Sequence, residues 1–187
     1  MTQQPDAGGW RTLSSELKYD NAWVAVTEHQ VVNPGGGRGI YGTVHFKHLA
    51  VGVLSLDDEG NTWLVGQYRY PLKRYSWEMP EGGGAIDVDP LESARRELKE
   101  ETGIEARDWR LLLELDLSNS VTDERAYIYL ATGLSFGEAA PEETEALSLR
   151  KLPFTEAYAM VGDGRITDSL TVAAVLRLRL LQLEGGL

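Results

Sequence analysis

The sequence has no cysteine, few basic residues and no long apolar run. Without cysteine there can be no disulfide, thiolate nucleophile or zinc–thiolate site. The 18 Lys and Arg against 29 Asp and Glu give a net charge of -11, which argues against binding nucleic acid or an anionic membrane. No stretch approaches the roughly 18 apolar residues of a membrane span, and residues 1–9 carry no apolar run. We therefore expect a soluble protein, with the cytoplasm as the default location.

The remaining pattern predicts an α+β fold around one core, which suits 187 residues of 42% hydrophobic content. Asn21–Asn33 and the run from Ile40 are separated by Pro34–Gly39 and predict an N-terminal β-hairpin. Further runs rich in β-branched, leucine and aromatic residues predict strands at His48–Leu56, Thr62–Tyr68, Leu111–Leu117, Ala126–Thr132 and Leu147–Leu152. Helices are expected at about Pro90–Thr102, Thr155–Val161 and Asp168–Leu183, and Asp168 is the candidate N-cap of the last one.

The first of these helices carries the strongest local signals. Asp89 is a suitable N-cap, Pro90 suits the first helical position and Gly103 suits the C-terminal cap. At about 100° per residue, one face of this helix is apolar and a neighbouring arc is acidic. The apolar face holds Leu91, Ala94 and Leu98, and the acidic arc holds Glu97, Glu100 and Glu101.

The acidic arc needs a compensating positive charge. Glu97 and Glu101 lie one turn apart, where like charges cost a few tenths of a kcal/mol. A hard divalent cation would compensate them, since Mg²⁺ binds carboxylates, water and phosphate oxygens together. The three glutamates alone leave a solvated acidic helix face as the commoner alternative.

A longer pattern around this helix resembles the Nudix box. That box is a glycine, five residues, a glutamate, seven residues and then Arg-Glu-aliphatic-x-Glu-Glu-x-Gly-aliphatic. Gly82 opens the spacing here, and Arg96–Ile104 fit the second half at every fixed position. Val88 stands where the first glutamate is expected, between Asp87 and Asp89, either of which is a candidate to replace it. In the family that glutamate is mainly structural, so this departure concerns the geometry of the loop more than metal binding.

The resemblance implies a three-layer α/β/α sandwich with a mixed sheet and a divalent metal, Mg²⁺ or alternatively Mn²⁺. Glu97 and Glu101 would be the principal ligands, with Glu100 close by and the backbone carbonyl of Glu81 as a further ligand. Arg96 would orient the glutamates. A bound cation serves the chemistry because a diphosphate repels hydroxide and leaves poorly unless its charge is neutralised.

Beyond the box, the chain is similar to the ADP-ribose and nucleoside-diphosphate-sugar pyrophosphatases. In that branch an N-terminal β-hairpin region often builds a homodimer that completes the site, which implies an N-terminal region at residues 1–47 and a catalytic domain at 48–187. The resemblance gives Arg69 a contact with phosphate and places Glu78 in the pocket. For Trp77, stacking on a nucleobase competes with simple packing.

The acidic segment Glu142–Glu145 matches where several pyrophosphatases of this branch place a glutamate that activates water or adds a metal contact. By position, Glu143 is the first choice for the general base and Glu145 for the auxiliary metal contact. The alternative is an ordinary acidic surface loop, within the surface loop predicted for Gly137–Glu145. A loop that closes over bound substrate would bring a base to the attacking water.

The choice of substrate depends on Ser118–Ser120. ADP-ribose hydrolases commonly have Ser-Pro-Gly here, whereas this chain has Ser-Asn-Ser. Asn119 and Ser120 are candidates to bind sugar hydroxyls, although both also favour turns. We predict magnesium-dependent hydrolysis of a nucleoside-diphosphate sugar to nucleoside monophosphate and sugar 1-phosphate. The alternatives are hydrolysis of ADP-ribose to AMP and ribose 5-phosphate, and a Nudix-fold sensor that binds a nucleotide without cutting it.

Overall fold

The computed structural model describes residues 8–139 and 146–186. The described chain forms two compact units, the first from residues 8–48 with 116–124 and the second from the remaining residues. The sequence placed a boundary between residues 47 and 48, close to the division at His48 and Leu49, and did not group residues 116–124 with the N-terminal region. Each unit is described by itself below.

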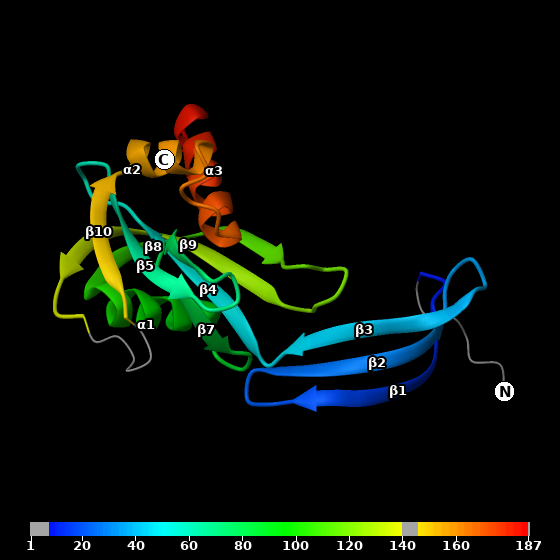
Figure 1. Ribbon diagram of the computed structural model, residues 1–187. Helices are drawn as coiled ribbons and strands as arrows, with labels where there is room; N and C mark the ends of the chain where they lie inside the picture. The colour runs from blue at the N-terminus through cyan, green and yellow to red at the C-terminus, as the bar shows by residue number, and fades with distance from the viewer. Residues whose placement is uncertain (1–7, 140–145, 187) are drawn as a thin grey trace. The chain divides into compact units, whose positions relative to one another are not determined.

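The first unit contains a three-stranded antiparallel sheet in the order β1–β2–β3 (Figure 1). Its strands are β1 (Arg11–Asp20), β2 (Val24–Val32) and β3 (Arg38–Phe46). The predicted hairpin corresponds to β2 and β3, with Val32 opposite Arg38. The sequence did not predict β1, because most of its residues are polar. In the structure almost all of them are exposed, and the pairing of β1 with β2 has two shifts in register.

The second unit contains two sheets. One has the order β10–β5–β6, with β10 (Ser148–Pro153) and β6 (Arg74–Glu78) both antiparallel to β5 (Asn61–Arg69). The other has the order β7–β4–β9–β8, in which β4 and β9 run parallel. Its strands are β7 (Glu81–Ala85), β4 (His48–Ser55), β9 (Arg125–Phe136) and β8 (Ile104–Asp116).

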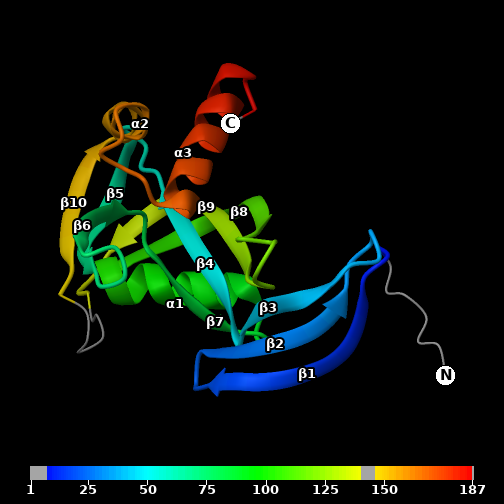
Figure 2. The same ribbon diagram turned by 45° about the vertical axis from the view of Figure 1, so that its right-hand side comes forward.

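Three helices cover these strands, α1 (Pro90–Thr102), α2 (Phe154–Gly162) and α3 (Ser169–Leu183). Helix α1 lies on one side of the strands, and α2 and α3 lie on the other (Figures 1 and 2). The predicted three-layer α+β fold is therefore confirmed. No helix in the described residues is long and apolar enough to cross a membrane.

Two buried clusters hold the layers together. The first joins α1 to the strands and contains Val51, Val53, Trp63, Ala94, Leu98, Ile104, Tyr129 and Ala131. The second joins α2 to β5 and β10 and contains Leu64, Leu152, Ala157, Met160 and Ile166. The apolar face predicted for α1 is confirmed, since Ala94 and Leu98 are fully buried and Leu91 packs against the first cluster.

Helix α1 begins and ends as its cap residues predict. Asp89 accepts a hydrogen bond from the backbone N–H of Leu91 at 2.9 Å, and Pro90 is the first helical residue. Gly103 ends the helix with a φ of 70°, a conformation that favours glycine. Asp89 thus caps the helix start, and Val88, at the position where the box has a glutamate, is exposed.

Candidate metal and substrate site

Two of the α1 carboxylates, those of Glu97 and Glu101, are buried. Glu97 is 8% exposed and Glu101 is 3% exposed. The guanidinium of Arg96 donates to Glu97 Oε1, to Glu100 Oε2 and to the backbone carbonyl of Gly83, each at 2.7 Å. Arg96 therefore contacts two of the predicted glutamates and also the preceding strand.

Gly82 makes room for the carboxylate of Glu97. A Cβ atom at position 82 would lie 2.3 Å from Cδ of Glu97, far inside van der Waals contact. Only glycine therefore lets the backbone lie directly against this carboxylate. Gly82 of β7 and Glu97 of α1 are therefore in direct contact.

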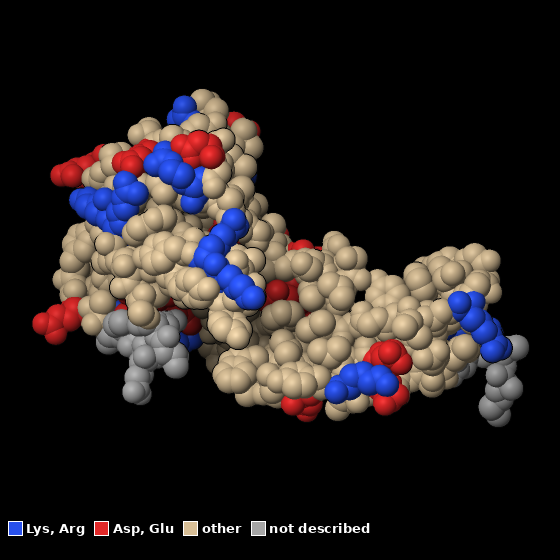
Figure 3. Space-filling model, in the orientation of Figure 1, with Lys and Arg blue, Asp and Glu red and all other residues tan. Residues whose placement is uncertain are grey.

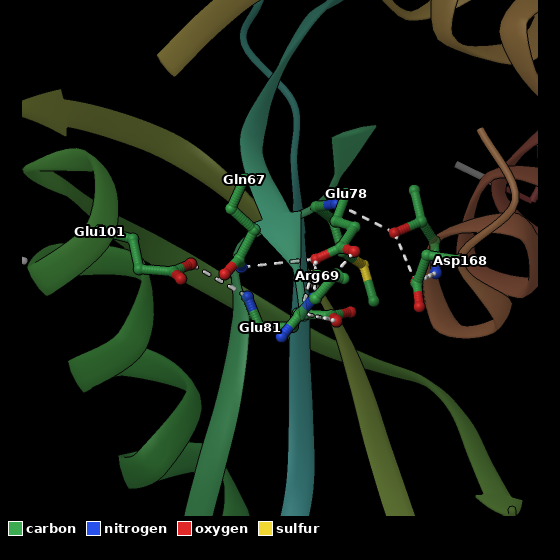
Figure 4. A network of polar contacts seen from close by, with 8 residues as sticks. Gln67, Arg69, Glu78, Glu81, Glu101 and Asp168 are labelled. Carbon is green, nitrogen blue, oxygen red and sulfur yellow. Dashed lines mark hydrogen bonds and ion pairs between the residues drawn. The ribbon is translucent and has the colours of Figure 1, made fainter. Parts of the chain in front are cut away.

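Glu81 connects α1 to a second group of charged residues (Figure 4). Its backbone N–H donates to Glu101 Oε2 at 3.0 Å. Its side chain points away from α1, and Glu81 Oε1 accepts from Arg69 Nη2 at 2.8 Å. The backbone of Glu81 is thus held at the helix while its carboxyl group belongs to the neighbouring cluster.

In that cluster, Arg69 donates hydrogen bonds to the buried carboxylate of Glu78. Arg69 Nε lies 3.0 Å from both carboxylate oxygens of Glu78, and Nη2 lies 2.5 Å from Oε2. Burial acts to lower the pKa of the Arg69 guanidinium, but the hydrogen bonds and charges of Glu78 and Glu81 outweigh it and raise that pKa. Arg69 therefore stays charged, with Nη1 free of hydrogen bonds to the described residues.

Asp168, at the start of α3, completes this cluster. Glu78, Glu81 and Asp168 each place one carboxylate oxygen within 4.8 Å of the other two, a convergence that the described α1 glutamates do not reach. Burial, followed by the charges of Asp168 and Glu78, raises the pKa of Glu81 well above its ordinary value, against the opposing effect of Arg69. Glu81 is therefore the group here that most readily carries a proton.

Both groups offer oxygen ligands, the kind that Mg²⁺ and Mn²⁺ accept. In the cluster of Glu78, Glu81 and Asp168, the positive charge of Arg69 already occupies the space between carboxylates. On α1, Arg96 makes a single contact with each of Glu97 and Glu100, and the backbone beside Glu97 is a glycine. The donor set of α1, with the adjacent backbone of Glu81, is therefore the better fit to a divalent cation.

The structure places other predicted residues elsewhere. Asn119 and Ser120 belong to the first unit, where the turn begins with a hydrogen bond from Val121 N–H to the Ser118 carbonyl at 2.8 Å. They line a cavity of about 370 Å³ in that unit. Trp77 is partly buried and packs against the second core cluster, which favours the packing alternative for its ring. Glu143 and Glu145 lie outside the described residues.

Sequence reasoning assigned Asp168 only to the cap of α3. The structure confirms the cap, with Asp168 Oδ2 accepting from Thr171 N–H at 2.7 Å, and also places this carboxylate beside Glu78 and Glu81. No spacing rule connects these residues, because they come from β6, β7 and α3. The only signal in the sequence was an aspartate at a helix start.

Comparisons with known proteins identify the family of this chain. Residues 46–170 match the NUDIX domain, and residues 10–44 match the nucleoside diphosphate sugar hydrolase N-terminal domain. An ADP-ribose pyrophosphatase of Mycobacterium tuberculosis is 38% identical over 89% of this chain and 82% of its own length. A GDP-mannose pyrophosphatase of Klebsiella pneumoniae is 28% identical over 94% of this chain and 85% of its own length.

The fold is also found in a solved structure. An ADP compounds hydrolase superposes with a TM-score of 0.85 over the full length of both chains, at 21% sequence identity. At that identity the likeness concerns the fold alone. Since the NUDIX match covers more than half of the chain and includes β7, α1 and the α1 carboxylates, this chain belongs to the Nudix family.

Proposed function

We propose that this protein hydrolyses the diphosphate bridge of a nucleoside-diphosphate sugar, giving nucleoside monophosphate and sugar 1-phosphate. The observation that carries the proposal is the packing of buried Glu97 and Glu101 against the Gly82 and Glu81 backbone in a Nudix chain. The match of residues 10–44 to a nucleoside diphosphate sugar hydrolase domain supports this class of substrate.

Glu97 and Glu101 hold the metal, with Glu100 and the backbone carbonyl of Glu81 as further ligands, and Arg96 keeps Glu97 and Glu100 in place. A bound Mg²⁺ or Mn²⁺ supplies neutralisation of the diphosphate charge and activation of water. The burial of Glu97 and Glu101 supports their part, because it keeps carboxylate oxygens next to the backbone of Gly82 and Glu81, and such oxygens are the ligands that Mg²⁺ prefers.

Arg69 binds a phosphate oxygen of the substrate. Its Nε and Nη2 are committed to Glu78 and Glu81, while its side chain remains 36% exposed. Nη1 is therefore the atom that donates to phosphate, and Glu78 fixes the direction in which it points. In this arrangement Glu78 acts in substrate binding through Arg69.

The remaining assignments come from the resemblance. Glu143 serves as the general base and Glu145 as an auxiliary metal contact, and Asn119 and Ser120 bind the sugar. The polar lining of the cavity beside Asn119 and Ser120, which includes Tyr41, His45 and Asp123, supports recognition of hydroxyl groups there.

Hydrolysis of ADP-ribose is the second candidate function. It is favoured by the mycobacterial ADP-ribose pyrophosphatase, which is 38% identical over most of this chain. The Ser-Asn-Ser sequence at 118–120 argues for a sugar nucleotide instead. The two reactions have the same metal site and differ in the group attached to the second phosphate.

We further propose a homodimer, built through the β1–β3 sheet, in the cytoplasm. Figure 3 shows charged side chains of both signs over this sheet on the face drawn, with uncharged residues between them. Exposed large apolar residues on its strands and turns include Leu13, Leu17, Tyr19, Trp23 and Ile40. Apolar surface of this kind is typical of an interface.

The dimer is tested by light scattering on two matched variants. Ile40→Asp, on β3, should convert a dimer into a monomer, because residue 40 is 65% exposed on the proposed interface. Ile86→Asp, at a residue 57% exposed in the second unit, should leave the mass unchanged. A wild-type monomer, or the same mass for all three proteins, would contradict the dimer.

The reaction is tested by product analysis with Mg²⁺ and a panel of GDP-mannose, GDP-glucose, UDP-glucose, ADP-glucose and ADP-ribose. The expected result is nucleoside monophosphate and sugar 1-phosphate from one group of sugar nucleotides, with kcat/KM above that for ADP-ribose. A higher kcat/KM for ADP-ribose would favour the second candidate. No product with any divalent metal, together with tight metal-independent binding of a substrate analogue, would favour a nucleotide sensor.

A further inference from the structure

We propose that Thr171, on helix α3, is a positioning residue for the metal site, and that Asp168 fixes the direction of its hydroxyl group. The inference rests on the proposed function, because it concerns the metal ligands of α1 and the backbone of Glu81. Thr171 lies one residue beyond the segment that matches the NUDIX domain.

Thr171 forms a short relay of hydrogen bonds between α3 and the segment after β6. Its side chain is fully buried, and Oγ1 accepts from the backbone N–H of Met79 at 2.9 Å. The same hydroxyl donates to Asp168 Oδ2 at 2.8 Å. A hydroxyl has a single hydrogen, so donation to Asp168 leaves a lone pair directed at Met79.

Met79 belongs to the short link between the two sheets. Met79 and Pro80 join β6 of one sheet to β7 of the other, and Pro80 has no N–H to donate. The Met79 side chain is fully buried and occupies the space that a Cβ at Gly52 would need, with Cε only 2.2 Å from that position. The Met79 N–H therefore depends on Thr171 rather than on solvent.

The link leads directly to the proposed ligands. The Pro80 carbonyl accepts from Val53 N–H at 2.8 Å, and the Glu81 N–H donates to Glu101 Oε2 at 3.0 Å. A shift of the backbone at Met79 therefore moves Glu81 and, through that hydrogen bond, the carboxylate of Glu101. Thr171 thus acts on the metal site through Met79 and Pro80 and does not itself contact a proposed ligand.

The effect should resemble that of other residues that orient metal ligands, whose loss typically weakens metal binding about 10- to 100-fold. A purely structural role would lower the thermal stability and leave metal affinity per folded molecule unchanged. Metal affinity, measured apart from turnover, separates these two roles.

The test compares Thr171→Val with two reference variants. Thr171→Val keeps the shape of the side chain but removes the hydroxyl, and Thr171→Ser keeps the hydroxyl. Thr62→Val is the matched control, because Thr62 is equally buried and its Oγ1 makes no hydrogen bond to the described residues. If Thr171→Val fails to fold, Thr171→Ala replaces it, with Thr62→Ala as its control.

Two readouts are measured, the binding of Mn²⁺ by electron paramagnetic resonance of the free ion and the Mg²⁺ concentration that gives half-maximal turnover. We expect Thr171→Val to weaken Mn²⁺ binding and to raise the half-maximal Mg²⁺ concentration by at least about tenfold. Thr171→Ser and Thr62→Val should stay within about twofold of the wild type, set against that tenfold effect.

If Thr171→Val and Thr62→Val bind Mn²⁺ equally well, and the wild-type protein turns over a substrate of the panel, the role of Thr171 is overturned and the proposed function stands. Failure of Thr171→Ser to restore affinity would overturn it as well, because the hydroxyl would then not be the decisive group. If the wild type itself neither binds Mn²⁺ nor turns over any substrate of the panel, the proposed function fails and this inference fails with it.

Discussion

Two clusters of charged residues meet at Glu81, and each combines three carboxylates with one arginine. On α1 these are Glu97, Glu100, Glu101 and Arg96, and in the cluster beside it they are Glu78, Glu81, Asp168 and Arg69. Their formal charges are therefore the same. What differs is the position of the arginine, since Arg69 binds Glu78 through two nitrogens and also reaches Glu81, whereas Arg96 makes one contact each to Glu97 and Glu100.

Convergence of carboxylates alone therefore does not identify a metal site. The cluster around Arg69 has the closer carboxylate oxygens, within 4.8 Å, but its guanidinium binds Glu78 through two nitrogens and also contacts Glu81. The α1 cluster is spread along a helix and has a glycine backbone at Glu97. We therefore propose that α1 binds the metal and that the other cluster orients Arg69.

The largest expected effect is on Glu101. Glu101→Gln keeps an oxygen that accepts the Glu81 N–H but loses the charge that compensates a cation. Loss of several kcal/mol of charge stabilisation should lower kcat/KM by about 1,000-fold. The melting temperature should stay within a few degrees of the wild type, since a like-charge pair on the helix is relieved. A wild-type rate at saturating Mg²⁺ would show that α1 does not hold the metal.

Glu78→Gln tests the opposite cluster through stability. The Glu78 side chain is 3% exposed, and its loss of charge leaves the half-buried Arg69 with Glu81 alone. We expect the free energy of unfolding, from urea titration, to fall by about 2 to 3 kcal/mol, less than the loss of a sole partner would cost. Glu92→Gln, at an exposed pair with Arg95, should cost at most about 0.5 kcal/mol.

The Glu78 variant also tests directly which of the two clusters binds the metal. If Glu78→Gln abolished Mn²⁺ binding while Glu101→Gln retained it, the metal would belong with Arg69 and the assignment of the two clusters would be reversed. The unfolding measurement alone does not distinguish these cases, so both variants are titrated with Mn²⁺.

Gly82→Ala tests the fit between β7 and Glu97. The added Cβ would lie 2.3 Å from Glu97 Cδ, so the carboxylate must move. We expect Mn²⁺ affinity to fall about 10- to 100-fold, as when a ligand loses its orientation. Gly162→Ala is the matched control, because a Cβ there meets nothing within 4 Å. Equal affinity in the two variants would show that Glu97 is free to adjust.

The α1 cluster was predictable from the sequence and its neighbour was not. Asp89, Pro90 and Gly103 act within one helix, so their local preferences predict its bounds, and Glu97 and Glu101 share a face by helical periodicity alone. Strand β7, with the sequence Glu-Gly-Gly-Gly-Ala, has no apolar alternation from which to predict a strand. It forms because β4 and α1 pack beside it.

Asp168 and Thr171 could not be assigned to the site from the sequence for a second reason. Their positions near Glu81 and Met79 depend on how α3 crosses the sheets, which no short motif encodes. The sequence predicted the cap at Asp168 correctly because a cap is local. The contacts that join α3 to the segment after β6 are tertiary, and only the fold brings them together.

The smallest expected effect concerns Asp57, a carboxylate outside both clusters that sets the baseline for an ordinary ion pair. Burial acts to raise the pKa of Asp57, but hydrogen bonds from Asn61 and Lys151 outweigh it and lower that pKa to about 2, the opposite direction from Glu81. A lowered folded-state pKa gives stability that is complete above the ordinary value of 3.8 and is lost as the pH falls towards 2.

Asp57→Asn should therefore lower the free energy of unfolding by about 1 kcal/mol at pH 7, allowing for solvent screening at the half-exposed Lys151. The difference from the wild type should shrink as urea titrations are repeated from pH 4 towards pH 2, over the window set by those two pKa values. Asp58→Asn, at the exposed neighbouring position, serves as the control. A pH-independent difference would mean that Asp57 acts through the geometry of its turn. If Asp57→Asn lowered the free energy of unfolding as much as Glu78→Gln, the ordinary ion pair and the buried Arg69 cluster would not differ in their contribution to stability.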